Sequence, residues 1–481
     1  MGGAVRDLLL QRPGPDLDLV VPSGGITIGR RFANALGADF MVLDEDRDTA
    51  RVIVVEPSGR RMYVDVSSYR DGSTIEADLR ARDFTINAIA MDLRNHTVLD
   101  PLGGARDLRE KRLRACSAGA VAADPVRAVR GVRLSTALNL EMESATREQI
   151  REAGPRLVAV TAERLRDELF RMLDGPRPFA AVRVLEALGI LDHMLPELRT
   201  LRGVEQPAPH VYDVWAHTLA TLESLSTLLE ALVDAGESDR RQDLMNGLLM
   251  LKVGRYGEFL RSHLNWPLNR ERSVRGVLFF SALYHDVAKP MCRSVDDLGR
   301  LQFLGHEKEG GRMAAERAAN LRLSNDEVAR VRISIENHMR FAQTVSRRSG
   351  DQPAPTRRAI YRFFRDTGSA GIDVVLLGLA DIRGKYGPQL SQDVWSNALD
   401  GARALLENYW EKPQESVSPP RLVDGNDLIE SLQLAPGPQV GRLLERIREA
   451  QAEGMVRTAM EAIQLARTWS ETHDPGEVEP S

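Results

Sequence analysis

A glycine pair ahead of a short apolar helix, and two aspartates at the start of the strand that follows, constrain how this chain begins to fold. Gly2 and Gly3 carry no side chains, so an anion can approach the backbone where the helix starts, near Ala4. Strand residues i and i+2 point the same way, so Asp16 and Asp18 share one face. Mg²⁺ commonly holds such repelling carboxylates together. The segment predicts a phosphate-binding turn facing a divalent-metal site, although both patterns also occur in ordinary loops and strand ends.

The chain has 481 residues, enough for three domains at roughly 150 residues each. It shows no membrane-length apolar run and no leader pattern, and its cysteines, Cys116 and Cys292, lie far apart. These features predict a cytoplasmic protein with no disulfide framework and no membrane partner. A net charge of −5 excludes a chain that is basic overall, but nine arginines between 127 and 171 allow a local surface for a polyanion.

Residues 1–116 alternate helix and strand patterns, which predicts an α+β domain. After the Asp16 strand, the predicted elements are a helix at 28–36, a strand at 39–44, and a β-hairpin of 49–56 and 61–67 closed by a turn at 57–59. In the second hairpin strand, Asp65 points away from the face that carries Val64 and Val66. Asp65 is therefore a candidate third carboxylate, with a solvent-facing role as the alternative.

The segment 76–90 (EADLRARDFTINAIA) predicts a helix with one apolar and one polar side. The side chains expected to face a core are Leu79, Phe84 and Ile86, and those expected on the polar side are Arg82, Asp83 and Asn87. The next segment, 100–108, is rich in turn residues and predicts the end of the domain.

From about residue 117 the strand signal fades and helices dominate. In the sequence DPVRAVRGVRL, Asp124 predicts an N-cap and Pro125 the first helical position. Arginines recur every third residue along this helix, at Arg127, Arg130 and Arg133. Because we expect this stripe to have few acidic partners, it favours phosphate or base-edge contacts over a merely solvated face. Residues 163–173 predict a second helix of this kind.

Histidines gather in the helical region beyond Pro207, where His210 and His217 flank a long helix. The adjacent pair His285 and Asp286 ends an apolar helix. An isolated histidine is more often structural, but a His–Asp pair with further His and Asp residues on other helices favours a site for a transition metal or Mg²⁺. The candidate ligands are His217, His285, Asp286, His306, His338 and Asp381.

A proline-rich break at 412–420 predicts a linker, and the following stretch to residue 469 predicts two or three amphipathic helices. The last dozen residues predict a disordered end. The expected parts of the chain are 1–116, 117–204, 205–411 and 412–481. The expected fold class is an α+β first part followed by three all-α parts.

Together these motifs resemble the bacterial CCA tRNA nucleotidyltransferase and poly(A) polymerase family (class II), from residue 2 to about 470. The matching motifs are GGAVRD at 2–7, DLD at 16–18, RDFTINA at 82–88, DPVRAVR at 124–130, ERLRDEL at 163–169, LVDGND at 422–427 and GPQVG at 437–441. RDFTINA is the most specific of them. The histidine-bearing region is similar to the HD phosphohydrolase domain inserted in many members.

The resemblance implies a nucleotidyltransferase head with a small mixed sheet, followed by helical neck, HD and tail domains. It implies that Asp16 and Asp18 bind two Mg²⁺ ions and that Asp65 is the third catalytic carboxylate. The nucleotide-binding residues that it implies are Gly2, Gly3, Arg6, Arg82, Asp83, Asn87, Asp124, Arg127, Arg130 and Arg133. The implied ligands of a divalent metal in the HD domain are His217, His285, Asp286 and Asp381, with His306 and His338 as accessory residues.

The implied activity is template-independent addition of CMP and AMP, from CTP and ATP, to the 3′ end of tRNA. The tail helices would grip tRNA by its phosphates and A-form shape, and DNA is not an expected partner. The alternatives within this class are addition of CC or A only, and poly(A) synthesis. Two alternatives from other classes are a phosphohydrolase acting on 2′,3′-cyclic or 2′-phosphates through the HD domain, and a pure tRNA-binding module.

Three departures from the family pattern bear on these expectations. A strand normally precedes the glycine pair, so either the sheet has one strand fewer or the true start lies upstream of Met1. Ala81 stands where a second arginine is usual, which predicts one weaker phosphate or nucleotide contact. The connection from Asp65 to Asp78 is short, as in members that add only part of the CCA sequence.

Overall fold

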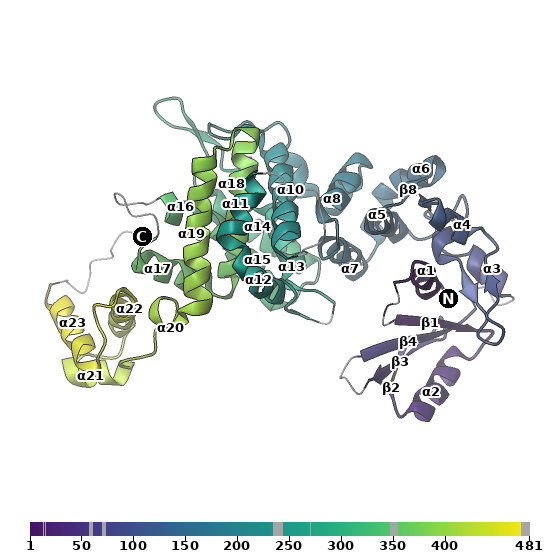
Figure 1. Ribbon diagram of the computed structural model, residues 1–481, viewed down its shortest axis with the longest axis horizontal. Helices are drawn as coiled ribbons and strands as arrows, with labels where there is room; N and C mark the ends of the chain where they lie inside the picture. The colour runs from purple at the N-terminus through teal and green to yellow at the C-terminus, as the bar shows by residue number, and fades with distance from the viewer. Residues whose placement is uncertain are drawn as a thin grey trace. The chain divides into compact units, whose positions relative to one another are not determined.

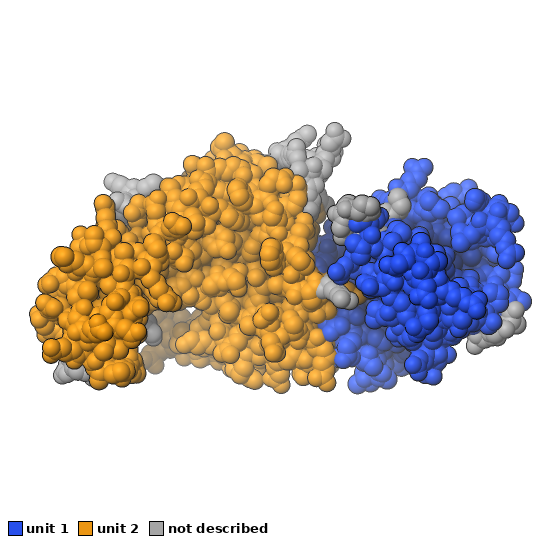
Figure 2. Space-filling model, turned by 90° about the horizontal axis from the view of Figure 1, so that it is seen from below, with its two compact units in different colours: residues 1–196 blue, residues 197–481 orange. Residues whose placement is uncertain are grey.

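The computed structural model describes residues 1–12, 14, 16–56, 61–69, 74–233, 244–269, 271–346 and 355–472. It divides the chain into two compact units, Met1–Pro196 and Glu197–Ser481 (Figures 1 and 2). The turn predicted at 57–59 and nearly all of the end predicted to be disordered lie outside the described residues.

The first unit combines strands and helices, and the described part of the second is helical apart from one short hairpin, which confirms the expected fold class. The elements of the first unit are α1 (Gly3–Leu9), β1 (Asp16–Val21), α2 (Gly25–Leu36), β2 (Asp39–Asp44), β3 (Thr49–Val55), β4 (Arg61–Ser68), α3 (Ile75–Arg80), η2 (Thr85–Asn87), β5 (Ala90–Met91), β6 (Val98–Leu99), α4 (Gly104–Arg109), β7 (Arg112–Leu113), α5 (Val126–Leu138), β8 (Glu141–Met142), α6 (Ser144–Ala153), η3 (Gly154–Ala159), α7 (Ala162–Leu173), α8 (Pro178–Ala187) and α9 (Leu191–Met194). The following elements are η4 (Pro196–Leu201), α10 (Val214–Leu232), α11 (Leu244–Val253), η6 (Gly254–Tyr256), α12 (Gly257–Leu264), α13 (Val274–Tyr284), β9 (Ser294–Val295), β10 (Leu301–Gln302), α14 (His306–Asn320), α15 (Asn325–Glu336), α16 (His338–Ser346), α17 (Arg357–Thr367), η7 (Gly368–Ala370), α18 (Gly371–Tyr386), η8 (Gly387–Gln389), α19 (Gln392–Glu411), α20 (Pro413–Ser416), α21 (Gly425–Leu432), α22 (Pro438–Glu453) and α23 (Ala459–Thr472).

A four-stranded sheet in the order β1-β4-β3-β2 organises the first unit. β1 runs parallel to β4, and β3 lies antiparallel to both β4 and β2, which confirms the predicted hairpin strands. The parallel pairing places Asp18 directly opposite Asp65. α2 packs on one face of the sheet, over a buried core made of Ala33, Val52, Val64 and Val66.

Asp48 fixes the turn between β2 and β3. Its carboxylate accepts hydrogen bonds from the backbone N–H groups of Gly25 at 2.7 Å and Ile26 at 2.9 Å. α2 begins without a side-chain cap of its own, so Asp48 satisfies N–H groups that would otherwise lack a partner at the start of this helix. The contact holds in place the turn that carries Arg47.

The helix predicted over 76–90 is wrong in its second half, because α3 ends early and Phe84 is extended. The Phe84 N–H donates to the Asp83 carboxylate at 2.7 Å, and the Thr85 N–H donates to the Arg114 carbonyl at 2.9 Å. These partners take the N–H groups that a continuous helix would need. The residues predicted to face a core are indeed buried: Leu79, Phe84 and Ile86.

Two further local expectations are corrected. The segment predicted to be rich in turns contains the helix α4, whose first N–H groups donate to the Asp100 carboxylate at 2.7 and 2.9 Å. The next predicted helix start also shifts, because α5 has Pro125 at its N-cap and no side-chain cap. The carboxylate of Asp124 instead accepts a hydrogen bond from Arg164 in α7 at 2.6 Å.

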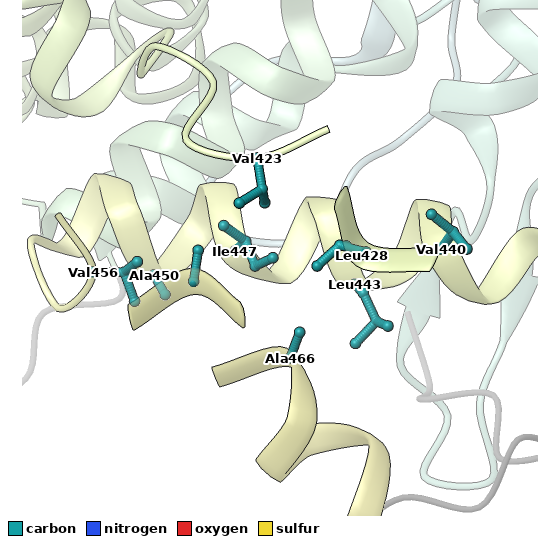
Figure 3. Close-up of a cluster of buried hydrophobic side chains, with 9 residues drawn as sticks. Val423, Leu428, Val440, Leu443, Ile447, Ala450, Val456 and Ala466 are labelled. Atoms are coloured by element: carbon teal, nitrogen blue, oxygen red, sulfur yellow. The ribbon is translucent and has the colours of Figure 1, made fainter. Parts of the chain in front are cut away.

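In the second unit, α10, α13 and α18 pack against one another. The tail helices α21, α22 and α23 confirm the predicted amphipathic helices and enclose an apolar cluster of their own (Figure 3). The labelled members of that cluster are Val423, Leu428, Val440, Leu443, Ile447, Ala450, Val456 and Ala466. Glu449 in α22 holds the tail to α17 by accepting from Arg358 at 2.7 Å and from Arg362. The predicted linker contains the short helix α20.

The described ranges contain no helix that is both long and apolar enough to cross a membrane. Along the chain, the division between the two units falls between Pro196 and Glu197, near the expected boundary between the second and third parts. The finer division into four parts stays a prediction.

Candidate functional site

The carboxylates predicted to hold metal lie on the neighbouring strands β1 and β4. Asp18 is opposite Asp65, and Asp16, two residues earlier on β1, is exposed. Burial raises the pKa of Asp18, the N-terminal ammonium of Met1 and the Arg82 guanidinium lower it, and the charges of Asp65 and Asp16 raise it further. Mutual repulsion of this kind is relieved by a divalent cation, so the donor set fits a metal site. In the structure, Arg51 pairs with Asp65, with nitrogen–oxygen distances of 2.7 and 2.8 Å.

A cavity of about 880 Å³ opens beside these carboxylates within the first unit. The predicted residues that line it are Gly3, Arg6, Asp18, Asp65, Arg82, Asp83, Asn87, Asp124, Arg127, Arg130 and Arg133. Gly2 and Asp16 are not part of the lining. Gly2 still lies against the site: a Cβ atom there would stand 2.7 Å from Nη1 of Arg82, and its φ of +65° also favours glycine.

A second cavity, of about 690 Å³, lies against the same carboxylates. The residues shared by both cavities are Asp18, Arg47, Asp65, Arg82 and Arg127. Asp18, Asp65 and these three arginines therefore lie where the two cavities adjoin. The sequence interpretation did not single out Arg47, because its place on the β2–β3 turn gives it no motif to belong to.

The RDFTINA segment and α1 build one side of the larger cavity. Arg6 donates to the Asn87 side-chain oxygen at 2.7 Å and pairs with Asp7 at 2.7 Å. Asn87 in turn donates to Asp83 at 3.2 Å. This chain of bonds fixes the Arg6 guanidinium at the cavity wall, and Arg82, held by Asp78 at 3.2 Å, lies on the same wall. Fixed guanidinium groups of this kind suit phosphate oxygens.

The arginine stripe on α5 has more acidic partners than the sequence led us to expect. Glu168, from α7, accepts from Arg130 at 2.8 Å and from Arg133 at 2.6 Å. Asp83 accepts from Arg130 at 3.2 Å. Burial would raise the pKa of Glu168, but the charges of Arg133 and Arg130 outweigh it and lower that pKa. The expectation of few acidic partners was wrong because those partners lie far away in the sequence.

We expect Glu168→Ala to lower the free energy of unfolding by about 2 kcal/mol. Removing one member of a buried ion pair destabilises the fold, because the charges of its partners are left uncompensated. The loss of stability is smaller here than for a fully buried pair, because Arg130 and Arg133 are partly exposed and water can solvate them. Urea unfolding followed by far-UV circular dichroism measures the change. The control is Glu163→Ala, on the exposed first turn of the same helix, and an equal loss in both variants would contradict the buried-pair explanation.

The six predicted HD residues come together in the second unit. They lie on α10, at and just after the end of α13, on the first turns of α14 and α16, and on α18. Their ligand atoms form two groups. One contains His217, His285 and Asp381, and the other contains Asp286, His306 and His338. These groupings include the two histidines that were expected only as accessory residues.

Asp286 belongs to the second group and also faces the first. Its Oδ2 is 3.1 Å from His285 Nε2 and 3.4 Å from His217 Nε2, while its Oδ1 is 3.4 Å from His306 Nε2. Both Asp286 Oδ1 and His306 Nε2 are buried and have no hydrogen-bond partner among the described residues. Buried polar atoms without partners are costly, so their convergence fits a pair of divalent metal ions.

Backbone carbonyls orient three of the histidines. The Nδ1 atoms of His285, His306 and His338 lie 2.8, 2.7 and 2.7 Å from carbonyl oxygens three residues earlier. A proton on Nδ1 leaves Nε2 unprotonated and aimed at the cluster, as metal ligation requires. Burial lowers the pKa of His338 to about 3, so its ring is neutral near pH 7.

A cavity of about 600 Å³ opens onto this cluster. Four cationic side chains line it, namely Lys289, Lys308, Arg340 and Lys385. Lys289 also lies 2.7 Å from Asp286 Oδ2. Cations around a carboxylate–imidazole cluster suit an anionic molecule such as a phosphate ester. The sequence interpretation missed these residues, because isolated lysines and arginines carry no signal until the fold gathers them.

The chain is similar to known protein families and proteins. Residues 1–114 match the family described as the poly A polymerase head domain, and residues 139–201 match one described as a probable RNA and SrmB-binding site of polymerase A. The A-adding tRNA nucleotidyltransferase of Deinococcus radiodurans is 32% identical over 480 residues, covering 98% of this chain and 95% of that protein. The chain belongs to the bacterial CCA tRNA nucleotidyltransferase and poly(A) polymerase family.

A second relative and two solved structures are also similar to this chain over nearly its whole length. The CC-adding tRNA nucleotidyltransferase of Geobacter sulfurreducens is 32% identical over 480 residues, covering 99% of this chain and 93% of that protein. A solved CCA-adding enzyme, in a form without bound ligand, shares the fold with a TM-score of 0.60 at 20% identity, over 99% of this chain and 91% of that one. The Thermotoga maritima CCA-adding enzyme in complex with tRNA gives a TM-score of 0.55 at 20% identity, over 97% and 90%.

Proposed function

We propose that this chain adds CMP and AMP, from CTP and ATP, to the 3′ end of tRNA without a nucleic-acid template, building or repairing its CCA terminus. The observation that carries the proposal is the parallel pairing that sets Asp18 opposite Asp65, between two cavities that share these carboxylates. One cavity would receive the nucleoside triphosphate and the other the end of the RNA. The full-length A-adding and CC-adding relatives support the same class of substrates.

In this proposal Asp16, Asp18 and Asp65 hold Mg²⁺. Bound there, the metal would lower the pKa of the RNA 3′-hydroxyl and stabilise the attacking and leaving oxygens of an in-line displacement. Arg6 and Arg82 would neutralise and orient the triphosphate, since both are fixed at the wall of the larger cavity.

Asp124 would select the base from the same cavity. Cytosine and adenine each present an amino donor beside a ring-nitrogen acceptor, whereas uracil and guanine present a carbonyl beside an N–H. A carboxylate acceptor beside an arginine donor therefore matches the first two bases with one arrangement of side chains. Protein side chains would thus replace a template strand.

The size of the product tests this proposal. We would supply CTP and ATP together to a tRNA that lacks its last three nucleotides, to a tRNA that ends in CC, and to an unrelated RNA. Complete addition lengthens the first by three nucleotides and the second by one, and leaves the unrelated RNA unchanged. Extension of the unrelated RNA by many adenylates would instead identify poly(A) synthesis, and extension of none of the three would overturn the proposal.

Partial addition is a second candidate because the full-length relatives are an A-adding and a CC-adding enzyme. The short connection between Asp65 and Asp78 points the same way. The same three RNAs distinguish partial addition from complete addition of CCA. A CC-adding enzyme lengthens the truncated tRNA by two nucleotides, and an A-adding enzyme lengthens only the tRNA that already ends in CC.

The histidine cluster supports a further candidate activity, a metal-dependent phosphohydrolase acting on 2′-phosphates or 2′,3′-cyclic phosphates of RNA. Its six ligands fit two divalent ions with Asp286 between them, and four cationic side chains line its cavity. We expect divalent metal to stimulate phosphate release and Asp18→Ala to leave it unchanged. Phosphate release that falls with Asp18→Ala would contradict a separate hydrolytic site.

A further inference from the structure

Arg47 lies on the β2–β3 turn, and its backbone is held on both sides. Its N–H donates to the Asp44 carboxylate at 3.0 Å, and its carbonyl accepts from the Thr49 hydroxyl at 3.0 Å. The next residue, Asp48, accepts hydrogen bonds from the first N–H groups of α2. None of these bonds uses the Arg47 guanidinium, so the turn fixes the backbone and leaves this group open to a ligand.

Among the described residues shared by the two cavities of the first unit, Arg47 has the most accessible positive charge. Its side chain is 68% exposed, and its Nε stands 3.6 Å from the Asp44 carboxylate, beyond hydrogen-bond distance. The other two arginines that line both cavities are largely buried, since Arg82 is 17% exposed and Arg127 is 11% exposed. An incoming anion can therefore reach Arg47 more fully than either of them.

The second cavity, proposed to receive the end of the RNA, has an acidic wall. The described residues that line it include five aspartates and three arginines, whereas those of the larger cavity include four aspartates and eight arginines. A triphosphate in the larger cavity therefore meets arginines that the second cavity lacks. RNA in the second cavity meets mainly carboxylates, among them the exposed Asp46 beside Arg47. A phosphate group there needs a cation to offset this repulsion.

We propose that Arg47 binds the phosphate that joins the last two nucleotides of the RNA being extended, an inference that rests on the proposed nucleotidyl transfer. For transfer, the terminal 3′-hydroxyl must reach Asp18 and Asp65, which border the second cavity. The phosphate that precedes the terminal nucleoside then faces the turn that carries Arg47. A guanidinium donates two parallel N–H groups to phosphate oxygens, so Arg47 both neutralises this phosphate and orients the end of the RNA.

The test measures the KM for tRNA and the KM for CTP separately, with a tRNA that lacks its last three nucleotides. For Arg47→Ala we expect the KM for tRNA to rise roughly fivefold, because a charge-assisted contact is lost, and the KM for CTP to stay within about twofold of the parent. Asp46→Ala removes a repelling charge, so we expect it to lower the KM for tRNA. The control is Arg31→Ala, which removes an exposed arginine of α2 that lines neither cavity and should match the parent.

A neutral linkage in the RNA identifies the phosphate that Arg47 binds. We would replace the linkage between the last two nucleotides of this tRNA with an uncharged methylphosphonate. With the parent chain, the neutral linkage should raise the KM about as much as Arg47→Ala raises it for the natural tRNA. With Arg47→Ala it should cause no further rise, because the contact is already lost. Two rises that add fully would show that Arg47 does not bind this phosphate and would overturn the inference.

The two substrates separate the possible roles of Arg47. A rise in the KM for CTP alone would show that Arg47 holds the triphosphate, and an unchanged KM for tRNA in Arg47→Ala would show that it does not hold the RNA. Either result contradicts the proposal. A thermal melt of each variant checks that the fold is retained. If the parent chain itself extended no tRNA, the proposed function would fail first, and that result is distinct from the outcomes above.

Discussion

Replacement of Asp18 with alanine is expected to slow nucleotide transfer to tRNA by on the order of 10³-fold, which corresponds to several kcal/mol of lost transition-state stabilisation. Asp18 lies opposite Asp65, is partly buried, and borders both cavities. Its loss removes the carboxylate that is best placed to hold a metal ion between the two substrates. Single-turnover incorporation of labelled CMP measures the effect.

Asp39→Ala is the matched control for this experiment. Asp39 is an exposed aspartate at the start of β2, the strand at the far edge of the same sheet. We expect the Asp39→Ala variant to incorporate CMP at a rate within about twofold of the parent, because surface substitutions of this kind change the stability of the fold little. If Asp18→Ala retained most of the parent rate, the two-metal assignment of these carboxylates would be wrong, even if the chain still added nucleotides.

Replacement of Asp286 with alanine is expected to lower the bound divalent metal from about two ions per chain to one or fewer. Asp286 directs one oxygen toward each group of histidines. The first group keeps His217, His285 and Asp381, while the second is reduced to two histidines. Two imidazoles form an incomplete coordination shell, so the ion held there should be lost. Metal analysis after dialysis against metal-free buffer measures the stoichiometry.

Asp286→Asn serves as a second variant, since it preserves the volume of the side chain in this buried position. The control is Asp297→Ala, an exposed aspartate of the same unit, which should retain the metal content of the parent. A full complement of metal in both Asp286 variants would contradict the arrangement with Asp286 between two ions. A parent chain that binds no divalent metal would contradict the metal site altogether.

The local features of the nucleotide site could be predicted well from sequence. Alternation of side chains in a strand is a property of neighbouring residues, so the shared face of Asp16 and Asp18 and the outward position of Asp65 follow from the sequence alone. The pairing of β1 with β4 is not local, because β2 and β3 lie between these two strands in the sequence although β1 and β4 are neighbours in the sheet. Asp65 therefore remained a candidate until that pairing placed it opposite Asp18.

Three of the wrong predictions arose where a group distant in the sequence forms a hydrogen bond or ion pair. The Arg114 carbonyl takes an N–H that a helix over 76–90 would need. Glu168 pairs with an arginine stripe that begins more than thirty residues before it. Arg164 takes the carboxylate of Asp124 that the sequence assigned to a helix cap. Each partner comes from another element, so no local pattern contains it.

The histidine cluster shows the same division between local and distant information. The adjacent His285 and Asp286 are a strong local signal of metal binding, and the other candidate ligands are histidines and an aspartate on separate predicted helices. Their sorting into two groups depends on which helices pack together, because α10 and α18 meet on one side of Asp286 while α14 and α16 supply the other. The spacing of these residues along the sequence therefore does not predict which of them group together.

We propose that this chain transfers nucleotides to tRNA and selects the base with protein side chains. The most direct test of this proposal supplies the four labelled nucleoside triphosphates one at a time, with no template strand, to a tRNA lacking its last three nucleotides and to a tRNA ending in CC. We expect label from CTP on the first tRNA and from ATP on the second, with little label from UTP or GTP on either. Label from none of the four, or equally from all four, would contradict it.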